Sequence, residues 1–172
     1  MTFDKPFSAG LKTGYLFVPD SLVDPMIQQK GNHDFGTASL CQHLLSRAIE
    51  TGDYADQVER VRKAYTIKRD AMVSALEEFM APMGQAARWE RPNGGLYVWL
   101  TLAEGFDTRR GQALFERCID KGVLYVPGDY CFFAQKGAPA PTRHIRLTYG
   151  VGNPALLREG IRRLAEAVAE QA

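Results

Sequence analysis

The segment Met1–Val18, MTFDKPFSAGLKTGYLFV, is the stretch from which the rest of the chain is interpreted. Lys5 follows Thr2 and Asp4, and Lys12 lies between two glycines just before an apolar run. A lysine amine forms a Schiff base with a carbonyl once it has lost its proton. A hydroxyl and a second cation suit an anion such as phosphate, and glycine lets the backbone approach a ligand closely. Taken alone, the pattern also fits a solvated surface lysine.

Two short patterns within this segment resemble the lysine motif of class I and II aminotransferases. Residues 2–5 read TFDK, and residues 9–15 read AGLKTGY. The family pattern is Ser/Thr-x-x-Lys followed by Pro-Gly-Leu-Arg-x-Gly-Tyr. These enzymes depend on pyridoxal phosphate and have the α/β fold called fold type I, or aspartate-aminotransferase-like. The resemblance therefore implies this fold, represented here by its small carboxy-terminal domain and the end of its large domain.

The resemblance also implies roles for individual residues in this segment. Lys5 matches the lysine that forms the Schiff base with pyridoxal 5′-phosphate, and Thr2 matches a hydroxyl that binds the cofactor's phosphate. Lys12 matches the phosphate-binding arginine, but it replaces a forked guanidinium with a point charge. Ala9 stands where the family has a proline.

Composition limits the classes of function that the chain can have. Of its 172 residues, 45% are hydrophobic and 24% are charged, which is ordinary for a globular protein. With 21 basic and 20 acidic residues, the chain has no net field that would attract nucleic acid or an anionic membrane. It contains no apolar run long enough to span a bilayer. Cys41, Cys118 and Cys131 are widely spaced and favour a reducing, cytoplasmic compartment. We expect each to be a small buried residue.

The lysine motif lies at the start of this chain, whereas in the resembling family it lies past the middle of the polypeptide. We therefore expect the chain to be the carboxy-terminal part of a longer enzyme. The expected division is a remnant of the large domain over 1–52, a long interdomain helix over 53–84, and a small α/β domain over 85–172. No metal site is expected, since His33 has no second ligand at helical spacing.

Hydrophobic periodicity and turn residues predict the elements of the chain. Helices are expected over 21–29, 37–51, 53–80, 107–121 and 153–170. Strands are expected over 14–18, 87–91, 96–100, 123–126 and 144–149. Loops are expected over 30–36 and 130–142. The elements from about residue 85 onward predict a largely antiparallel sheet flanked by the last two helices. Within residues 92–100, PNGGLYVWL, which resembles a family signature P-x-GG-x-x-x-W, Tyr97 and Trp99 are expected to pack in the core.

Arg146 is the second residue that indicates a site. In the strand 144–149, Ile145, Leu147 and Tyr149 alternate with His144, Arg146 and Thr148, so the arginine faces away from the apolar set. By itself it fits a surface ion pair. The segment Ile145–Tyr149, IRLTY, resembles the family's R-L-S/T-F/Y strand, whose arginine binds the substrate α-carboxylate. We expect its guanidinium to face an open cleft shared with Lys5.

Together these resemblances imply transamination between an amino acid and a 2-oxo acid, carried out by a homodimer in the complete enzyme. Because the family's partner for the pyridine nitrogen precedes the lysine motif, we do not expect the 172-residue chain to be active alone. Two alternatives stay open. One is another fold-type I protein, such as a decarboxylase, a lyase or the carboxy-terminal half of a transcription regulator. The other is a non-catalytic α/β interaction module.

Overall fold

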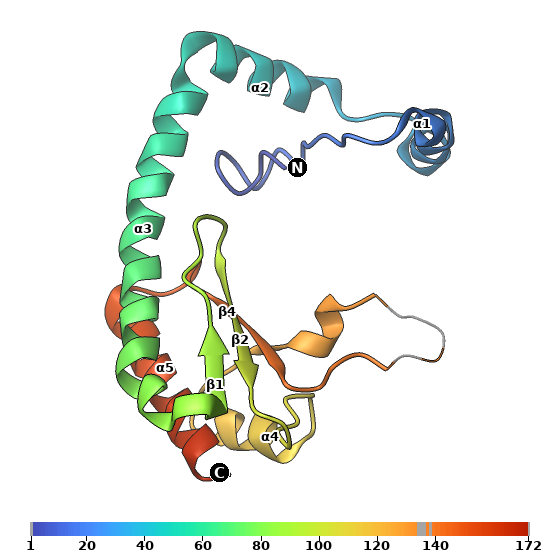
Figure 1. Ribbon diagram of the computed structural model, residues 1–172. Coiled ribbons are helices and arrows are strands. Elements are labelled where there is room, and N and C mark those ends of the chain that lie inside the picture. The colour runs from blue at the N-terminus through green and yellow to red at the C-terminus, as the bar shows by residue number, and fades with distance from the viewer. Residues whose placement is uncertain (1, 134–136, 138, 172) are drawn as a thin grey trace. The chain divides into compact units, whose positions relative to one another are not determined.

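The computed structural model describes residues 2–133, 137 and 139–171. The chain divides into two compact units, Met1–Lys63 and Ala64–Ala172, with the boundary inside one long helix. Figure 1 shows the elements of each unit. The helices are α1 (Asp20–Asp34), α2 (Ser39–Thr51), α3 (Asp53–Phe79), α4 (Ala113–Asp120) and α5 (Pro154–Ala169), with short 3₁₀ helices η1 (Ala81–Ala86) and η2 (Gly128–Cys131). The strands are β1 (Ala87–Trp89), β2 (Tyr97–Leu102), β3 (Val126–Pro127) and β4 (His144–Thr148).

The second unit is built on an antiparallel sheet with the strand order β1-β2-β4-β3. Every pairing in this sheet is antiparallel, which confirms the predicted sheet type. The pairing of β2 with β4 is the longest and places Trp99 opposite Arg146 and Leu100 opposite Ile145. Side chains of neighbouring residues therefore alternate between the two faces of the sheet in register across both strands.

One face of the sheet is buried against helices. In Figure 1, α3 and α5 run along this side of the sheet. The core joins the second half of α3 and the inner faces of α4 and α5 to alternate residues of β2 and β4. Its fully buried members include Val73, Leu76, Val98, Leu100, Leu114, Ile145, Leu164 and Val168. The strand residues between them lie on the opposite face, as the alternation in the sequence predicts.

Helix ends show recognised capping chemistry at two places. Asn153 caps α5, because its Oδ1 accepts a hydrogen bond from the Leu156 amide at 2.9 Å, and Pro154 takes the first helical position. Gly52 ends α2 in the left-handed conformation with φ 87°. Among the described residues, no helix combines the length and apolar character that crossing a bilayer requires.

Several elements differ from the sequence-based expectations. Residues 15–19 form no strand, and the described part of this region contributes only an isolated bridge between Thr2 and Gly14. A strand needs a partner for its backbone groups, and among the described residues only Gly14 of the run 14–18 takes part in a β-bridge. The helix expected over 21–29 runs as α1 to Asp34, so His33 is helical and not in a loop.

The helix expected from residue 107 begins only at Ala113. Asp107 uses its carboxylate to accept from the Arg109 amide and guanidinium, which makes a local turn and not a helix cap. Gly111 has φ 81°, which also interrupts a helical path. The strand expected over 123–126 is confined to Val126–Pro127. Of the loop expected over 130–142, residues 134–136 and 138 lie outside the described residues.

The expected burial of several side chains is also corrected. Tyr97 and Trp99 were expected in the core, but their exposed fractions are 42% and 36% and both lie on the open face of the sheet. Of the cysteines, Cys118 is buried as expected, while Cys41 is half-buried and Cys131 is exposed. Burial raises the pKa of the Cys118 thiol to about 11, so it is not a reactive thiolate.

Gly128 shows how closely the chain packs beside β4. A Cβ atom at this position would lie 2.6 Å from the His144 carbonyl oxygen, inside van der Waals contact with rigid backbone. Gly160 is different, because a Cβ there would meet no atom within 4 Å. The two glycines therefore provide a matched pair of positions in the same unit.

We predict that Gly128→Ala lowers the unfolding free energy of the second unit by about 1–3 kcal/mol through overpacking. Gly160→Ala should raise it by about 0.5–1 kcal/mol, because alanine is the better helix former. Both tryptophans, Trp89 and Trp99, lie in this unit, so their fluorescence during urea unfolding reports on it. Equal unfolding midpoints for the two variants would show that the close approach to β4 carries no energetic weight.

Candidate active site

The lysine motif forms a closed loop in the first unit. An antiparallel bridge joins Thr2 to Gly14, and the Phe3 amide donates to the Thr13 carbonyl at 3.0 Å. Inside the loop, the Leu11 amide donates to the Ser8 carbonyl at 3.2 Å. These short-range hydrogen bonds bring both halves of the motif into one compact segment.

The three motif residues with proposed roles all lie on this loop. The Thr2 hydroxyl accepts from the Asp4 amide at 3.1 Å, which leaves its own proton available for donation. Lys5 is exposed. Lys12 has φ 50°, which is uncommon for a residue with a side chain, and its side chain is 77% exposed. The loop thus presents a hydroxyl donor and two amines to its surroundings.

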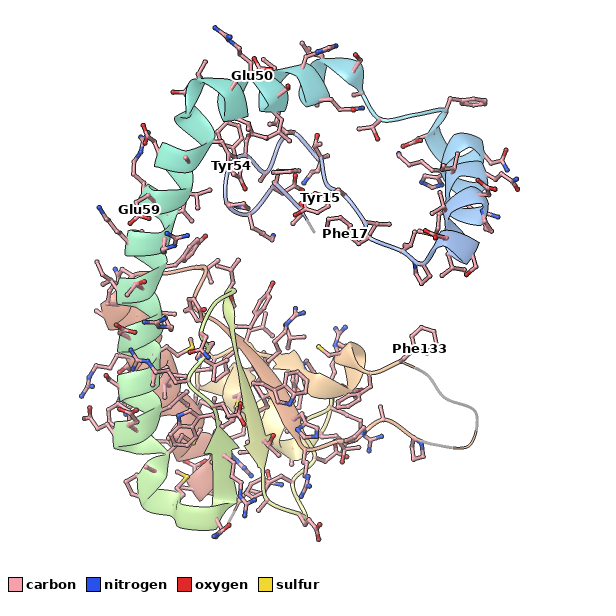
Figure 2. The ribbon with its side chains drawn as sticks, turned by 45° about the horizontal axis from the view of Figure 1, so that its top comes forward. Tyr15, Phe17, Glu50, Tyr54, Glu59 and Phe133 are labelled. Carbon is pink, nitrogen blue, oxygen red and sulfur yellow. The ribbon has the colours of Figure 1, made fainter. Side chains whose placement is uncertain are left out.

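Aromatic side chains pack against the loop. The Tyr54 ring, in the first turn of α3, lies 5.7 Å from the rings of both Phe3 and Phe7. Figure 2 shows Tyr54 directed toward the loop, with Tyr15 and Phe17 on the segment that follows it. The Tyr15 ring is 5.5 Å from Phe3. Sequence reasoning missed Tyr54, since nothing in the pattern of a long amphipathic helix distinguishes its first aromatic residue.

Arg146 lies on the open face of the sheet in the second unit. Its guanidinium carbon lies 4.6 Å from the centre of the Tyr97 ring, a cation–π contact between β4 and β2. Its Nε is buried and has no hydrogen-bond partner among the described residues. A buried charged donor without an acceptor is unfavourable, so this group is suited to an anionic ligand. Arg146 also lines a cavity of about 240 Å³ near β3 and α5.

An aromatic cluster lies beside Arg146 on the same face. The Trp99 ring stacks on His144 with centroids 5.4 Å apart, and Phe132 lies 6.0 Å from Trp99. Thr101 Oγ1 lies 3.0 Å from His144 Nδ1, within hydrogen-bond distance. Burial, with a smaller effect of Arg143, holds the pKa of His144 below its usual value. A further cavity of about 920 Å³ is lined in part by Tyr97, Trp99 and Thr101.

The structure thus groups the predicted residues in two places. Thr2, Lys5 and Lys12 share one loop of the first unit, while Arg146 lies in the second. The predicted cleft shared by Lys5 and Arg146 stays a prediction. The assignment of Arg146 to the face opposite Ile145 agrees with the structure.

Comparison with known proteins shows what this chain is similar to. A scan against protein-family models finds no match. The aromatic-amino-acid aminotransferase 1 of Thermococcus litoralis is 34% identical over 170 residues, covering 99% of this chain and 38% of that protein. The crystal structure of Pyrococcus horikoshii kynurenine aminotransferase, in complex with PMP, kynurenine and its product, superimposes with a TM-score of 0.83 at 33% identity. The match covers 99% of this chain and 40% of the other.

Over almost its whole length, the chain is similar in sequence and in fold to fold-type I aminotransferases. Its antiparallel sheet and flanking helices correspond to the carboxy-terminal domain of that fold. The chain spans about two fifths of the length of the relatives that it matches. A transcription regulator also matches: the uncharacterized HTH-type regulator YdfD of Bacillus subtilis is 28% identical over 99% of this chain and 33% of that protein.

The residues of the lysine loop fit the cofactor that the family implies, pyridoxal 5′-phosphate. A phosphate accepts hydrogen bonds, and the loop offers the unused proton of the Thr2 hydroxyl and the exposed ammonium of Lys12. An exposed amine at Lys5 is accessible to an aldehyde. The donor set of this chain is therefore chemically suited to the phosphate and the carbonyl carbon of the cofactor.

The environment of His144 generates a prediction about pH. Its pKa is lower in the folded chain than its ordinary value of about 6.5. The unfolded chain therefore binds more protons than the folded chain as the pH falls below about 6.5, so the second unit should lose stability over that range.

Proton NMR of the His144 ring during a pH titration should give a midpoint below about 6.5, with the resonance identified by its absence in His144→Gln. That variant should also reduce the loss of stability on acidification. A His144 midpoint above 6.5, or an acid sensitivity unaltered in the variant, would contradict the burial of this ring against Trp99.

Proposed function

We propose that this chain is the carboxy-terminal part of a pyridoxal-phosphate-dependent aminotransferase, which transfers an amino group between an amino acid and a 2-oxo acid. The proposal rests on the closed loop, which holds the exposed Lys5 in the same short segment as the Thr2 hydroxyl and the Lys12 amine. The unpartnered guanidinium nitrogen of Arg146 on an open aromatic face supports it independently. The similarity to aminotransferases along 99% of the chain agrees with both.

In this proposal the loop residues bind the cofactor. Thr2 donates its hydroxyl proton to the phosphate and Lys12 supplies a positive charge beside it. Lys5 would hold the cofactor through its amine and, when that amine is free, would move a proton at the substrate Cα. Pyridoxal phosphate supplies the electron sink for this chemistry when it is bound.

Arg146 recognises the substrate in this proposal. A guanidinium donates two parallel hydrogen bonds to a carboxylate, which fixes both its position and its orientation. The Tyr97 ring, 4.6 Å away, holds the guanidinium on the open face, and the unpartnered Nε provides one of the donors. Fixing the carboxylate orients the Cα–H bond for proton removal.

The proposal extends to the assembly and the compartment of the complete protein. α1 has no buried residue, and it exposes Leu22, Met26 and Ile27. Exposed apolar surface of this kind suits packing against another domain or chain, in line with a homodimer. The described cysteines are free thiols, which suits a reducing, cytoplasmic environment. Amino acids and 2-oxo acids are the proposed small-molecule partners.

The second candidate function is a ligand-sensing domain of a transcription regulator, and it rests on the similarity to YdfD. A sensing domain would also bind a cofactor or an amino acid, but it would not catalyse repeated conversion of substrate. Steady-state transamination with a 2-oxo acid as acceptor separates the two candidates, since only the enzyme converts both substrates over many cycles.

We predict that Lys5→Ala abolishes both the visible absorbance band of the bound cofactor and transamination in the complete polypeptide. Lys5→Arg should fail equally, because a guanidinium stays protonated and cannot act as the nucleophile. Lys30→Ala, at an exposed lysine of the same unit, is the control and should keep both properties. A complete protein whose absorbance band persists in Lys5→Ala would refute the assignment of Lys5.

We further predict that Arg146→Lys weakens amino-acid binding roughly ten- to a hundred-fold and leaves the affinity for cofactor unchanged, because a bidentate charged contact is lost. Arg143→Lys provides the control, since Arg143 is nearby on the chain and pairs with Glu104 at 3.7 Å. The measurement is KM for the amino acid together with the dissociation constant of the cofactor. Loss of cofactor with an unchanged KM would contradict the proposed role.

A further inference from the structure

The lysine loop holds a carboxylate next to the amine proposed to bind phosphate. Asp4 Oδ2 lies 3.8 Å from Lys12 Nζ, and the Asp4 side chain is only 20% exposed. Its other oxygen, Oδ1, is buried and has no hydrogen-bond partner among the described residues. A mostly buried carboxylate with an unsatisfied oxygen depends on a nearby cation, and Lys12 is the cation paired with it.

Two hydrogen bonds hold the backbone at Asp4 and at the residue before it. The Asp4 amide donates to Thr2 Oγ1 at 3.1 Å, and Phe3 is hydrogen-bonded to the opposite limb of the loop at Thr13. The Lys12 side chain is long and mostly exposed. When an anion enters the loop, the lysine side chain can therefore move more readily than the carboxylate.

We propose that Asp4 competes with the cofactor's phosphate for Lys12 and thereby lowers the affinity of the loop for the phosphate group. The inference rests on the proposed function, since it assumes that the loop binds this cofactor. An incoming phosphate must draw the Lys12 ammonium away from Asp4 Oδ2 and must remain close to a like charge. Because the Lys12 side chain is mostly exposed, salt screens its attraction to Asp4, so the effect is modest and depends on ionic strength.

The phosphate group can be isolated by comparing two aldehydes, pyridoxal phosphate and pyridoxal. Each is incubated with the chain, the adduct on Lys5 is trapped with borohydride, and labelling of that lysine is measured by peptide mass spectrometry. The ratio of labelling by the two aldehydes reports what the phosphate contributes to binding in the loop. The ratio is a binding readout and requires no turnover.

Asp4→Asn keeps the shape of the side chain and removes its charge. We expect it to raise the labelling ratio at Lys5 about two- to five-fold at low salt, and much less at about 1 M salt. In a Lys12→Ala background the same change should have little effect, because the competition acts through Lys12. Asp34→Asn is the matched control, since Asp34 pairs with Lys30 at 2.6 Å outside the loop. It alters net charge equally and should leave the ratio unchanged.

The outcomes separate this inference from the proposed function. If the ratio exceeds one in the unaltered chain but Asp4→Asn does not raise it, the role of Asp4 is refuted and phosphate binding stands. An equal rise in Asp34→Asn, or an undiminished rise without Lys12, also overturns it. If neither the unaltered chain nor Asp4→Asn labels Lys5 more with pyridoxal phosphate than with pyridoxal, phosphate binding by this loop is itself refuted.

Discussion

The pairing of β2 with β4 is the constraint on which the second unit depends. Trp99 lies opposite Arg146 and Leu100 opposite Ile145, so the same register that buries the aliphatic residues turns the arginine outward. A shift of one residue would exchange the two faces, placing the guanidinium in the core and Ile145 in solvent. Burying that charge without a partner is strongly unfavourable. The core and the candidate substrate site are therefore set by one hydrogen-bonded ladder.

The first unit is organised differently, around a loop that is closed within residues 2–14 and packs against Tyr54. The bridge between Thr2 and Gly14 closes the lysine loop, and Tyr54 supports it through Phe3 and Phe7. The loop's two cations and its carboxylate are held within this small segment. The chemistry of the loop then depends on whether Lys12 pairs with Asp4 or with an incoming anion.

Much of the fold follows from local sequence where a single rule decides the outcome. Alternation over Ile145–Tyr149 predicts the faces of β4, and Asn153 with Pro154 predicts the start of α5. The same alternation in β2 places Tyr97 and Trp99 on the open face, so the prediction that they pack in the core is wrong. Large aromatic residues are common in cores and in binding faces alike, so aromatic character alone does not decide between the two.

Other features depend on partners that are distant in sequence or on competing local chemistry. The apolar run over 14–18 has strand composition, yet Phe17 is 86% exposed, because composition cannot supply a neighbouring strand. Asp107 suits a helix cap and an isolated turn equally, and its contact with Arg109 selects the turn. The contact of Asp4 with Lys12 has no sequence signature, since it arises only when the loop closes.

We propose that the lysine loop and Arg146 bind one ligand in the complete polypeptide. The most direct test is a crystal structure of the complete polypeptide bound to an N-(5′-phosphopyridoxyl) amino acid, which joins cofactor and substrate in one molecule. We expect its phosphate at Thr2 and Lys12, its former aldehyde carbon facing Lys5, and its carboxylate on the Arg146 guanidinium. A bound ligand whose carboxylate is held elsewhere, with Arg146 directed away from it, would refute a shared role for these residues.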